Sequence, residues 1–225
     1  MYQDVWIIVP TYNEGPRLDS TLRSLCSRYT NVVVVDDGSE DRSREIAAQH
    51  PVWRLSHVVN CGQGAALQTG IDFALARGAE IVVTFDADGQ HCAEDVERVC
   101  EPIRTGRVEV ALGSRFLGTA QGIPWGRWLT LKGAVLFTRW YSGMRVTDTH
   151  NGLRALSRQA AGCLRIQQNR MAHASEILDQ IRRLGLRYAE VPITVRYTSG
   201  TLAKGQSSWN SLRIVGQLLL GRFTR

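Results

Sequence analysis

The chain lacks any apolar run near the roughly 18–20 residues that a membrane-spanning helix requires. It also lacks a Cys-x-x-Cys pair, and its five cysteines are odd in number. Free thiols are therefore expected, and with them a reducing, cytoplasmic location. The first segment, MYQDVWIIVP, places an Asp before a short β-like run, so we expect no secretory signal peptide.

Carboxylates are scarce in the second half of the chain. Residues 1–110 hold 17 Asp and Glu against 10 Lys and Arg, a balance of −7, whereas residues 111–225 hold 4 against 17, a balance of +13. An acidic half suits a metal ion, and a basic half suits phosphates or an anionic surface. Only 2 of the 27 basic residues are Lys. The guanidinium of Arg binds phosphate in a bidentate way, although genome composition also produces an arginine bias.

The remaining composition is that of an ordinary soluble domain, with 44% apolar and 21% charged residues. No repeat or linker divides the chain, so residues 1–225 are expected to form a single domain. Buried strands are predicted at residues 5–9, 32–35, 55–59, 81–85 and 108–112. Helical patterns separate them, which predicts an α/β fold with a doubly wound, mostly parallel, Rossmann-like sheet covered on both faces.

The second half is less regular. Segment 123–145 mixes Trp, Arg and aliphatic residues, and residues 171–184 have a helical pattern. Residues 186–197 are predicted to form a strand, and Pro192 places that strand at an edge or a bulge. The tail, 207–225, is predicted as an amphipathic helix.

Polar sequences follow four of the predicted strands: PTYNE, DDGS, NCGQG and DADGQH. In an open α/β sheet, ligands bind beyond the carboxyl ends of the strands, so these loops are expected to converge. Asp86 and Asp88 are two residues apart and can be aimed at one hard cation. Mg²⁺ or Mn²⁺ suits such oxygen ligands and would neutralise a diphosphate. The Gly62-x-Gly64 pair lacks the third glycine of a dinucleotide fingerprint, which argues against a nicotinamide dehydrogenase.

Taken together and in order, VPTYNE, VVDDGSED, NCGQGAALQTG and FDADGQH resemble the family 2 glycosyltransferases, which have the GT-A nucleotide-sugar fold. The resemblance covers essentially the whole chain. DADGQH is similar to the DAD-x-Q-H form of dolichyl- or polyprenyl-phosphate mannose synthases and their glucosyl relatives. The segments LGSRF, WGRWLTLKGAVLF, DTHNGLRALS and SEILDQIRRLG follow in that subfamily's order.

The resemblance implies a role for specific residues. The metal would be held by Asp86, Asp88 and Gln90. Nucleotide-sugar contacts would come from Pro10, Tyr12, Glu14, Asp37, Asp86, Ala87 and Asp88. Arg115 and Arg127 would bind the acceptor phosphate, and with Asp88 they would be the catalytic residues. Residues 1–115 would form the nucleotide-sugar and metal half, and residues 116–225 the acceptor and membrane-facing half.

The chain departs from the family at two points. Gln63 stands where many relatives carry a basic residue, which affects contacts with the donor. The membrane helices that follow the catalytic domain in many relatives are also missing from this sequence, which leaves open how a lipid is held.

The expected activity is inverting transfer of a hexose from a nucleotide diphosphate sugar, of the GDP-mannose or UDP-glucose type, to a polyprenyl or dolichyl phosphate. A phosphate acceptor is already an anion and needs no general base, whereas a hydroxyl acceptor needs a carboxylate. Asp148 and Glu176 are the candidate bases. We expect Asp148 instead to anchor the acceptor loop and Glu176 to pair with a nearby Arg. Two alternatives stay open: transfer to a sugar hydroxyl of a glycan or glycolipid, and a nucleotide-sugar-binding subunit without turnover.

Two further expectations concern histidine and the membrane. His91 follows the metal motif and either supports it or has no role, while His50, His57 and His173 are expected to be incidental. Tryptophan and arginine in 123–145 and 207–225 fit either a core or a membrane interface. The lipid substrate favours peripheral binding to the cytoplasmic face, with a separate small membrane protein as a possible partner. Nucleic acid is not expected as a partner.

Overall fold

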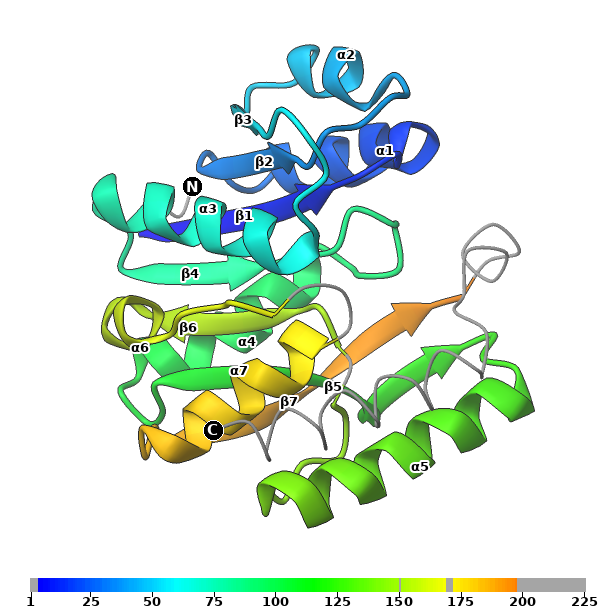
Figure 1. Ribbon diagram of the computed structural model, residues 1–225, viewed down its shortest axis with the longest axis vertical. Helices are drawn as coiled ribbons and strands as arrows, with labels where there is room; N and C mark the ends of the chain where they lie inside the picture. The colour runs from blue at the N-terminus through cyan, green and yellow to red at the C-terminus, as the bar shows by residue number, and fades with distance from the viewer. Residues whose placement is uncertain (1–3, 150, 169–171, 198–225) are drawn as a thin grey trace.

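The computed structural model describes residues 4–149, 151–168 and 172–197, which form one seven-stranded sheet between two layers of helices (Figure 1). The strands, in chain order, are β1 (Val5–Thr11), β2 (Val32–Asp36), β3 (Trp53–Ser56), β4 (Ile81–Thr84), β5 (Val110–Gln121), β6 (Arg154–Ser157) and β7 (Tyr188–Arg196). The helices are α1 (Gly15–Cys26), α2 (Ser43–Ala48), α3 (Gln63–Ala76), α4 (Glu94–Arg104), α5 (Trp125–Ser142), α6 (Arg158–Cys163) and α7 (Ala172–Arg183).

The strand order is β3-β2-β1-β4-β6-β5-β7. Neighbouring pairs are parallel except at β6, which runs antiparallel to both β4 and β5. The predicted doubly wound, mostly parallel sheet is therefore confirmed. The strand β6 was not expected from the sequence, and it separates β4 from β5.

Both faces of the sheet are buried, as the apolar runs of the strands indicate. Every residue of β1 is buried. Its alternate side chains enter two cores: Val5, Ile7 and Val9 pack with α1 and α4, whereas Trp6 and Ile8 pack with α3, α6 and α7. A strand covered on both sides cannot alternate apolar and polar residues, which explains why VWIIV is continuous.

The strand β7 lies at the edge of the sheet, where Pro192 removes no essential hydrogen bond. It pairs with β5, and the register shifts between Ser114 and Thr119. The expected edge position and irregularity are both present. Segment 123–145 contains the long helix α5, which contacts α7 and lies beside the lower strands in Figure 1. The predicted tail helix, 207–225, lies outside the described residues.

Candidate active site

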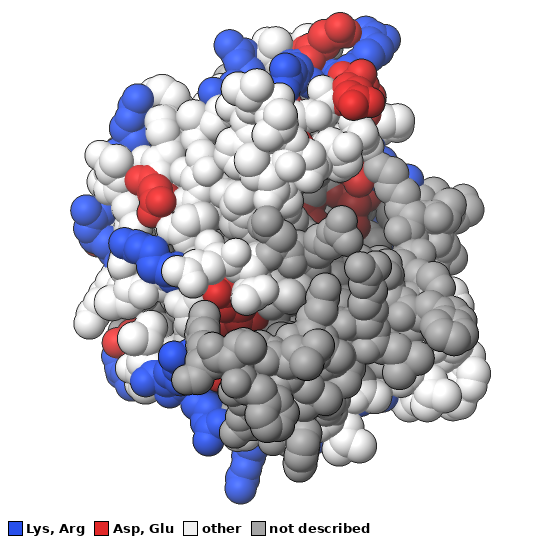
Figure 2. Space-filling view, in the orientation of Figure 1, with Lys and Arg blue, Asp and Glu red and all other residues white. Residues whose placement is uncertain are grey.

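The polar loops converge at the carboxyl edge of the sheet. Parallel pairing brings the ends of β1, β2 and β4 to one edge, and the amide of Asp37 donates to the carbonyl oxygen of Thr11 at 2.8 Å. The third loop reaches the fourth through Gln63, whose Nε2 donates to Asp86 Oδ1 at 3.1 Å. Figure 2 shows acidic side chains recessed in the surface near the loop after β4, whereas Lys and Arg side chains stand out at the edges of this face.

Asp86 is held by side chains from two directions. Gln63 donates to Oδ1, and His91 Nε2 lies 3.5 Å from Oδ2. Burial alone would raise the pKa of Asp86. The hydrogen bond and charge of His91, with the positive charges of His173 and Arg154, outweigh that effect and lower the pKa. The carboxylate therefore stays ionised in a side chain that is still 28% exposed.

The pKa of Asp88 is shifted in the opposite direction from that of Asp86. Its Oδ1 accepts a hydrogen bond from the amide of Gln90 at 3.0 Å. Burial and the nearby charge of Asp86 raise the pKa of Asp88 to about 6. Two partly buried carboxylates that repel each other, with the Gln63 amide on one of them, are the kind of oxygen donors that Mg²⁺ or Mn²⁺ takes. The charge of Asp86 acts on Asp88, so these two predicted metal residues lie near each other, and the amide of Gln90 contacts Asp88. Metal binding by Asp86, Asp88 and Gln90 stays a prediction.

Gly152 brings the DTHNG segment against the acidic pair. A β-carbon at this position would overlap the carboxylate of Asp86. The Gly152 carbonyl oxygen also accepts a hydrogen bond from Thr84 Oγ1 at 2.6 Å, at the end of β4. Only glycine permits this close approach of backbone to carboxylate.

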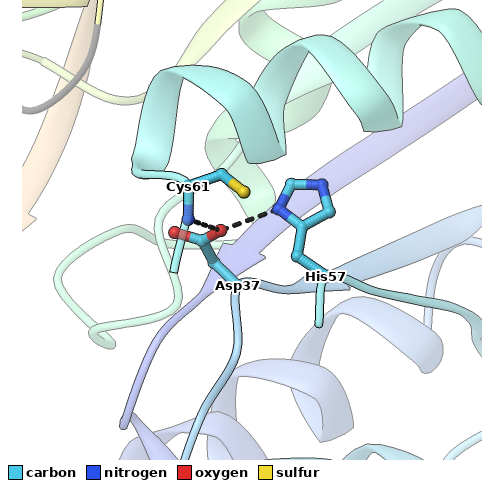
Figure 3. Close-up of side chains that lie close together, drawn as sticks. All are labelled: Asp37, His57 and Cys61. Atoms are coloured by element: carbon cyan, nitrogen blue, oxygen red, sulfur yellow. Dashed lines mark hydrogen bonds and ion pairs between the residues drawn. The ribbon is translucent and has the colours of Figure 1, made fainter. Parts of the chain in front are cut away.

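Asp37 is buried among donors from the β3–α3 loop (Figure 3). Oδ1 accepts from the amide of Cys61 at 2.9 Å, and Oδ2 accepts from the amide of Gly62 at 2.7 Å. His57 Nδ1 lies 2.7 Å from Oδ1. The side chain therefore orders the loop that leads into α3, and His57, expected to be incidental, takes part in this network.

Arg115 and Asp148 form a buried ion pair. Arg115 Nε donates to Asp148 Oδ2 at 2.6 Å, and its side chain is 5% exposed. The guanidinium also donates to the hydroxyl of Tyr197. In this arrangement the charge of Arg115 is committed to the protein. Its predicted contact with an acceptor phosphate stays a prediction, and the geometry favours a supporting role for it.

Glu190 on β7 fixes the loop that carries Asp148. Its carboxylate accepts from the amide of Thr147 at 2.8 Å, from Thr147 Oγ1 at 2.9 Å and from the amide of Asp148 at 3.1 Å. The predicted anchoring role of Asp148 is thus shared with Glu190. Glu176, expected to pair with an Arg, accepts from the backbone amides of Gln167 and Gln168 at 3.0 and 2.8 Å.

The other predicted residues differ in their accessibility. Pro10 and Ala87 are buried, Tyr12 is 44% exposed and Glu14 pairs with Arg17 at 2.8 Å. Arg127 lies in the first turn of α5, well after the metal motif in the sequence. Its side chain lies outside what the structure describes.

Sequence reasoning missed Arg154, the first residue of β6. Arg154 is 4% exposed, and its charge acts on both Asp86 and Asp148. Within the described residues no hydrogen bond to its guanidinium is found. Its position three residues after Asn151, in NGLR, was the available signal, because a basic residue there directly follows the segment that was predicted to contact the acceptor. His173, on α7, was also undervalued: it is buried and its charge acts on Asp86.

Comparison with known proteins agrees with this geometry. The family model described as "Glycosyl transferase family 2" matches residues 6–164. The UDP-N-acetylglucosamine–dolichyl-phosphate N-acetylglucosaminyltransferase of Methanococcus voltae is 31% identical, over 96% of this chain and 95% of its own. The polyprenol monophosphomannose synthase of Mycolicibacterium smegmatis is 29% identical, over 94% of this chain and 83% of its own.

Among solved structures, glucosyl-3-phosphoglycerate synthase from Mycobacterium tuberculosis, in complex with Mn²⁺ and UDP-glucose, superposes with a TM-score of 0.73. It is 21% identical, and the match covers 96% of this chain and 76% of that one. This likeness confirms the expected GT-A fold. With the family model spanning most of the sheet and its loops, the chain belongs to glycosyl transferase family 2 and resembles the dolichyl- and polyprenyl-phosphate sugar synthases.

Proposed function

We propose that this protein transfers a sugar, with inversion, from a nucleotide diphosphate sugar to the phosphate of a polyprenyl lipid. The names of the relatives support this choice of acceptor: one acts on dolichyl phosphate and another makes polyprenol monophosphomannose. The donor is proposed to be of the GDP-mannose or UDP-glucose type. The structural observation that supports the proposal is that each carboxylate in residues 111–225 already has a partner within the protein.

Each of those four carboxylates is already engaged by the protein. Asp148 is paired with Arg115, and Glu190 receives the donors of Thr147 and the amide of Asp148. Glu176 receives two backbone amides, and Asp179 lies 3.3 Å from Arg183. A hydroxyl acceptor requires a carboxylate that faces it and takes its proton. A phosphate acceptor does not, because its oxygen is an anion already and only has to be positioned.

A divalent cation is proposed at Asp86, Asp88 and Gln90. When bound, Mg²⁺ or Mn²⁺ offsets the charge of the departing nucleoside diphosphate. The chain's own contribution is to keep Asp86 ionised through His91, to orient it through the hydrogen bond from Gln63, and to hold Asp88 beside it. Gln63 is neutral where many relatives have a basic residue, so here the third loop orients a metal ligand through an amide donor. The predicted nucleotide contacts, from Pro10 to Asp37, line the adjacent loops.

Arg127 is proposed to meet the acceptor phosphate. Arg115 is proposed to act with it by holding the acceptor loop through Asp148. The basic character of residues 111–225, a balance of +13, suits an anionic lipid and an anionic surface.

The exposed face of α5 is proposed to lie on the membrane, on its cytoplasmic side. Trp125, Leu129 and Leu136 are 73%, 57% and 71% exposed. Their spacing of four and seven residues places them on one side of the helix. Within the described residues, no helix combines the length and hydrophobicity needed to cross a bilayer. An apolar stripe beside basic residues binds instead in the plane of the interface. A separate small membrane protein remains a proposed partner.

A donor and acceptor panel tests the proposed function. Radiolabelled GDP-mannose, UDP-glucose and UDP-N-acetylglucosamine are each offered with undecaprenyl phosphate, dolichyl phosphate or the unphosphorylated polyprenol. We expect label in the lipid phase with one donor and a phosphorylated acceptor, and none with the polyprenol. Transfer to polyprenol or to a glycan hydroxyl would establish the rival acceptor class. Binding of a nucleotide sugar without transfer to any acceptor would favour the role of a subunit without turnover.

A further inference from the structure

Asp37, His57 and Cys61 form a cluster with an oxygen, a nitrogen and a sulfur donor (Figure 3). The three ligand atoms all lie within 4.8 Å of one another. Asp37 directly follows β2, His57 follows β3, and Cys61 precedes α3. These residues are separate from the Asp86–Asp88 pair, and the proposed transfer reaction does not use the imidazole or the thiol.

Both ring nitrogens of His57 lie within hydrogen-bond distance of an oxygen atom. Nδ1 lies 2.7 Å from Asp37 Oδ1, and Nε2 lies 3.0 Å from Thr69 Oγ1. In the tautomer whose Nε2–H donates to Thr69 Oγ1, the lone pair of Nδ1 faces Asp37 Oδ1, so both atoms could bind one metal ion. Metal-bound histidines commonly have their outer nitrogen fixed in this way by an oxygen acceptor.

The rest of the cluster is prepared for an ion. Asp37 is 2% exposed and held by the amides of Cys61 and Gly62, so its carboxylate has a fixed direction. Cys61, by contrast, is exposed, which provides access from solvent and leaves room for water as a further ligand. In a tetrahedral zinc site, bond lengths of about 2.0–2.3 Å put neighbouring ligand atoms about 3.3–3.6 Å apart. His57 Nδ1 and Asp37 Oδ1, at 2.7 Å, would have to separate by somewhat under about 1 Å to reach that spacing. The Cys61 sulfur, within 4.8 Å of both, would have to approach them by at most about 1.5 Å.

We propose that Asp37, His57 and Cys61 bind a zinc-type divalent cation, at a site distinct from the Mg²⁺ or Mn²⁺ site of the transfer reaction. A thiolate and an imidazole select zinc over the hard cations that the acidic pair takes. On binding, the thiol of Cys61 releases its proton to water and no redox change occurs. Because Asp37 is also a predicted nucleotide contact, bound zinc would prevent Asp37 from contacting the donor. That consequence rests on the proposed function, whereas the site does not.

Cobalt tests the site directly, because Co²⁺ occupies zinc sites and a bound thiolate produces a charge-transfer absorption band in the near ultraviolet. The reduced, full-length protein is titrated with CoCl₂ and then with ZnCl₂, without nucleotide or acceptor. We expect a saturable thiolate band that zinc abolishes. Cys61→Ser should remove the band. His57→Gln should weaken cobalt binding by at least about tenfold, as expected for loss of one ligand or its support.

Two controls make the result specific. Cys163→Ser removes another exposed cysteine, on α6, and should keep the band. Asp88→Asn should keep it as well, because the proposed cluster does not include the acidic pair. Circular dichroism shows that each variant is folded. The proposal is overturned if the native protein gives no thiolate band, if the band survives Cys61→Ser, or if Cys163→Ser removes it. Loss in Asp88→Asn would merge the two sites and also overturn it.

Discussion

Arg115 and Asp148 are joined by an ion pair that water hardly reaches. Nε and Oδ2 are 2.6 Å apart, and the two side chains are 5% and 1% exposed. Asp148 Oδ1 has no hydrogen-bond partner within the described residues. This pair ties the middle of β5 to the loop that precedes β6, so it connects the predicted acceptor region to the sheet.

Loss of Arg115 should destabilise the protein strongly. Arg115→Met leaves a buried carboxylate without its cation, which is expected to lower the free energy of unfolding by about 3–5 kcal/mol. Adding Asp148→Asn should recover part of that loss, because no unpaired charge remains. Urea unfolding measures both. As a control, Arg23→Met removes an exposed partner of Asp19 and should cost less than about 1 kcal/mol. Equal effects of the two arginine changes would contradict the assignment.

Asp148 also separates the two acceptor classes. If the acceptor is a phosphate, Asp148→Asn and Glu176→Gln should reduce the single-turnover rate only as far as folding or loop order suffers. A general base typically contributes about 10²–10⁴-fold. A loss near or above the upper end of that range, in a variant with native circular dichroism and unchanged donor binding, would support a hydroxyl acceptor.

We expect transfer to require both a divalent metal ion and Asp88. Asp88→Asn is expected to abolish transfer while the fold remains intact, and EDTA should do the same reversibly. The pKa of Asp88, raised to about 6 by burial and by Asp86, adds a pH dependence. Below that pKa a proton competes with the ion, so Mn²⁺ affinity should rise about tenfold from pH 5 to pH 7 and change little above.

Calorimetric Mn²⁺ titration at several pH values measures this dependence. Asp88→Asn should show weak binding without the same rise. Full activity of demonstrably metal-free protein would remove the metal from the reaction. A flat affinity between pH 5 and pH 7 would show instead that Asp88 is not a ligand that must lose a proton.

Gly152→Ala should disturb the acidic pair from the backbone side. The new methyl group overlaps the carboxylate of Asp86, so either the loop or the carboxylate must move. Overpacking of this kind costs about 1–3 kcal/mol. We expect Mn²⁺ affinity and transfer to fall together. Gly162→Ala is the matched control, because its methyl group meets nothing within 4 Å and it lies in α6. Unchanged metal binding in Gly152→Ala would refute the close approach.

Membrane binding should depend on the exposed stripe of α5. The double variant Leu129→Glu, Leu136→Glu is expected to weaken co-sedimentation with anionic vesicles, and high salt should weaken binding of the native protein, because salt screens attraction to the surface. Leu184→Glu changes an exposed leucine at the end of α7 and should have little effect. If the native protein stays in the supernatant at low salt, α5 does not dock directly, and a partner protein must present the lipid.

The strands that the sequence predicted well are those buried on both faces. Residues 5–9, 32–35 and 81–85 are continuous apolar runs, and such runs are typical of strands that are buried on both faces. The prediction was wrong at 55–59: β3 is Trp53–Ser56, and Val58 and Val59 are 96% and 65% exposed. β-branched residues favour strands but do not by themselves place one.

Two other features of the sheet could not be predicted from local pattern. β6 has four residues and begins with Arg154, so it carries too little apolar signal. β5 extends to Gln121, well beyond the expected end at residue 112, because its last residues pair with β7 rather than being buried. Pairing partners that are distant in sequence leave no periodicity in the strand itself.

In the site, too, local pattern could be predicted, whereas contacts between residues distant in sequence could not. Asp86 and Asp88 could be placed because the carboxyl ends of parallel strands always meet at one edge. The ion pair of Arg115 could not, since Asp148 lies 33 residues away and spacing does not reveal the contact. Arg154 and His173 were missed for the same reason: each reaches Asp86 electrostatically from a separate element.

The clamp that Glu190 forms on Thr147 and Asp148 has a consequence for enzyme engineering. The loop that carries Thr147 and Asp148 is far from β7 in sequence, yet a carboxylate on β7 sets the backbone of that loop. A chimera that exchanges only the segment 143–152 with that of a relative would separate the loop from its matched anchor. If this loop contacts the acceptor as proposed, transplanting acceptor preference between family members requires both segments to be moved as a unit, and libraries that diversify the loop should keep position 190 as Glu.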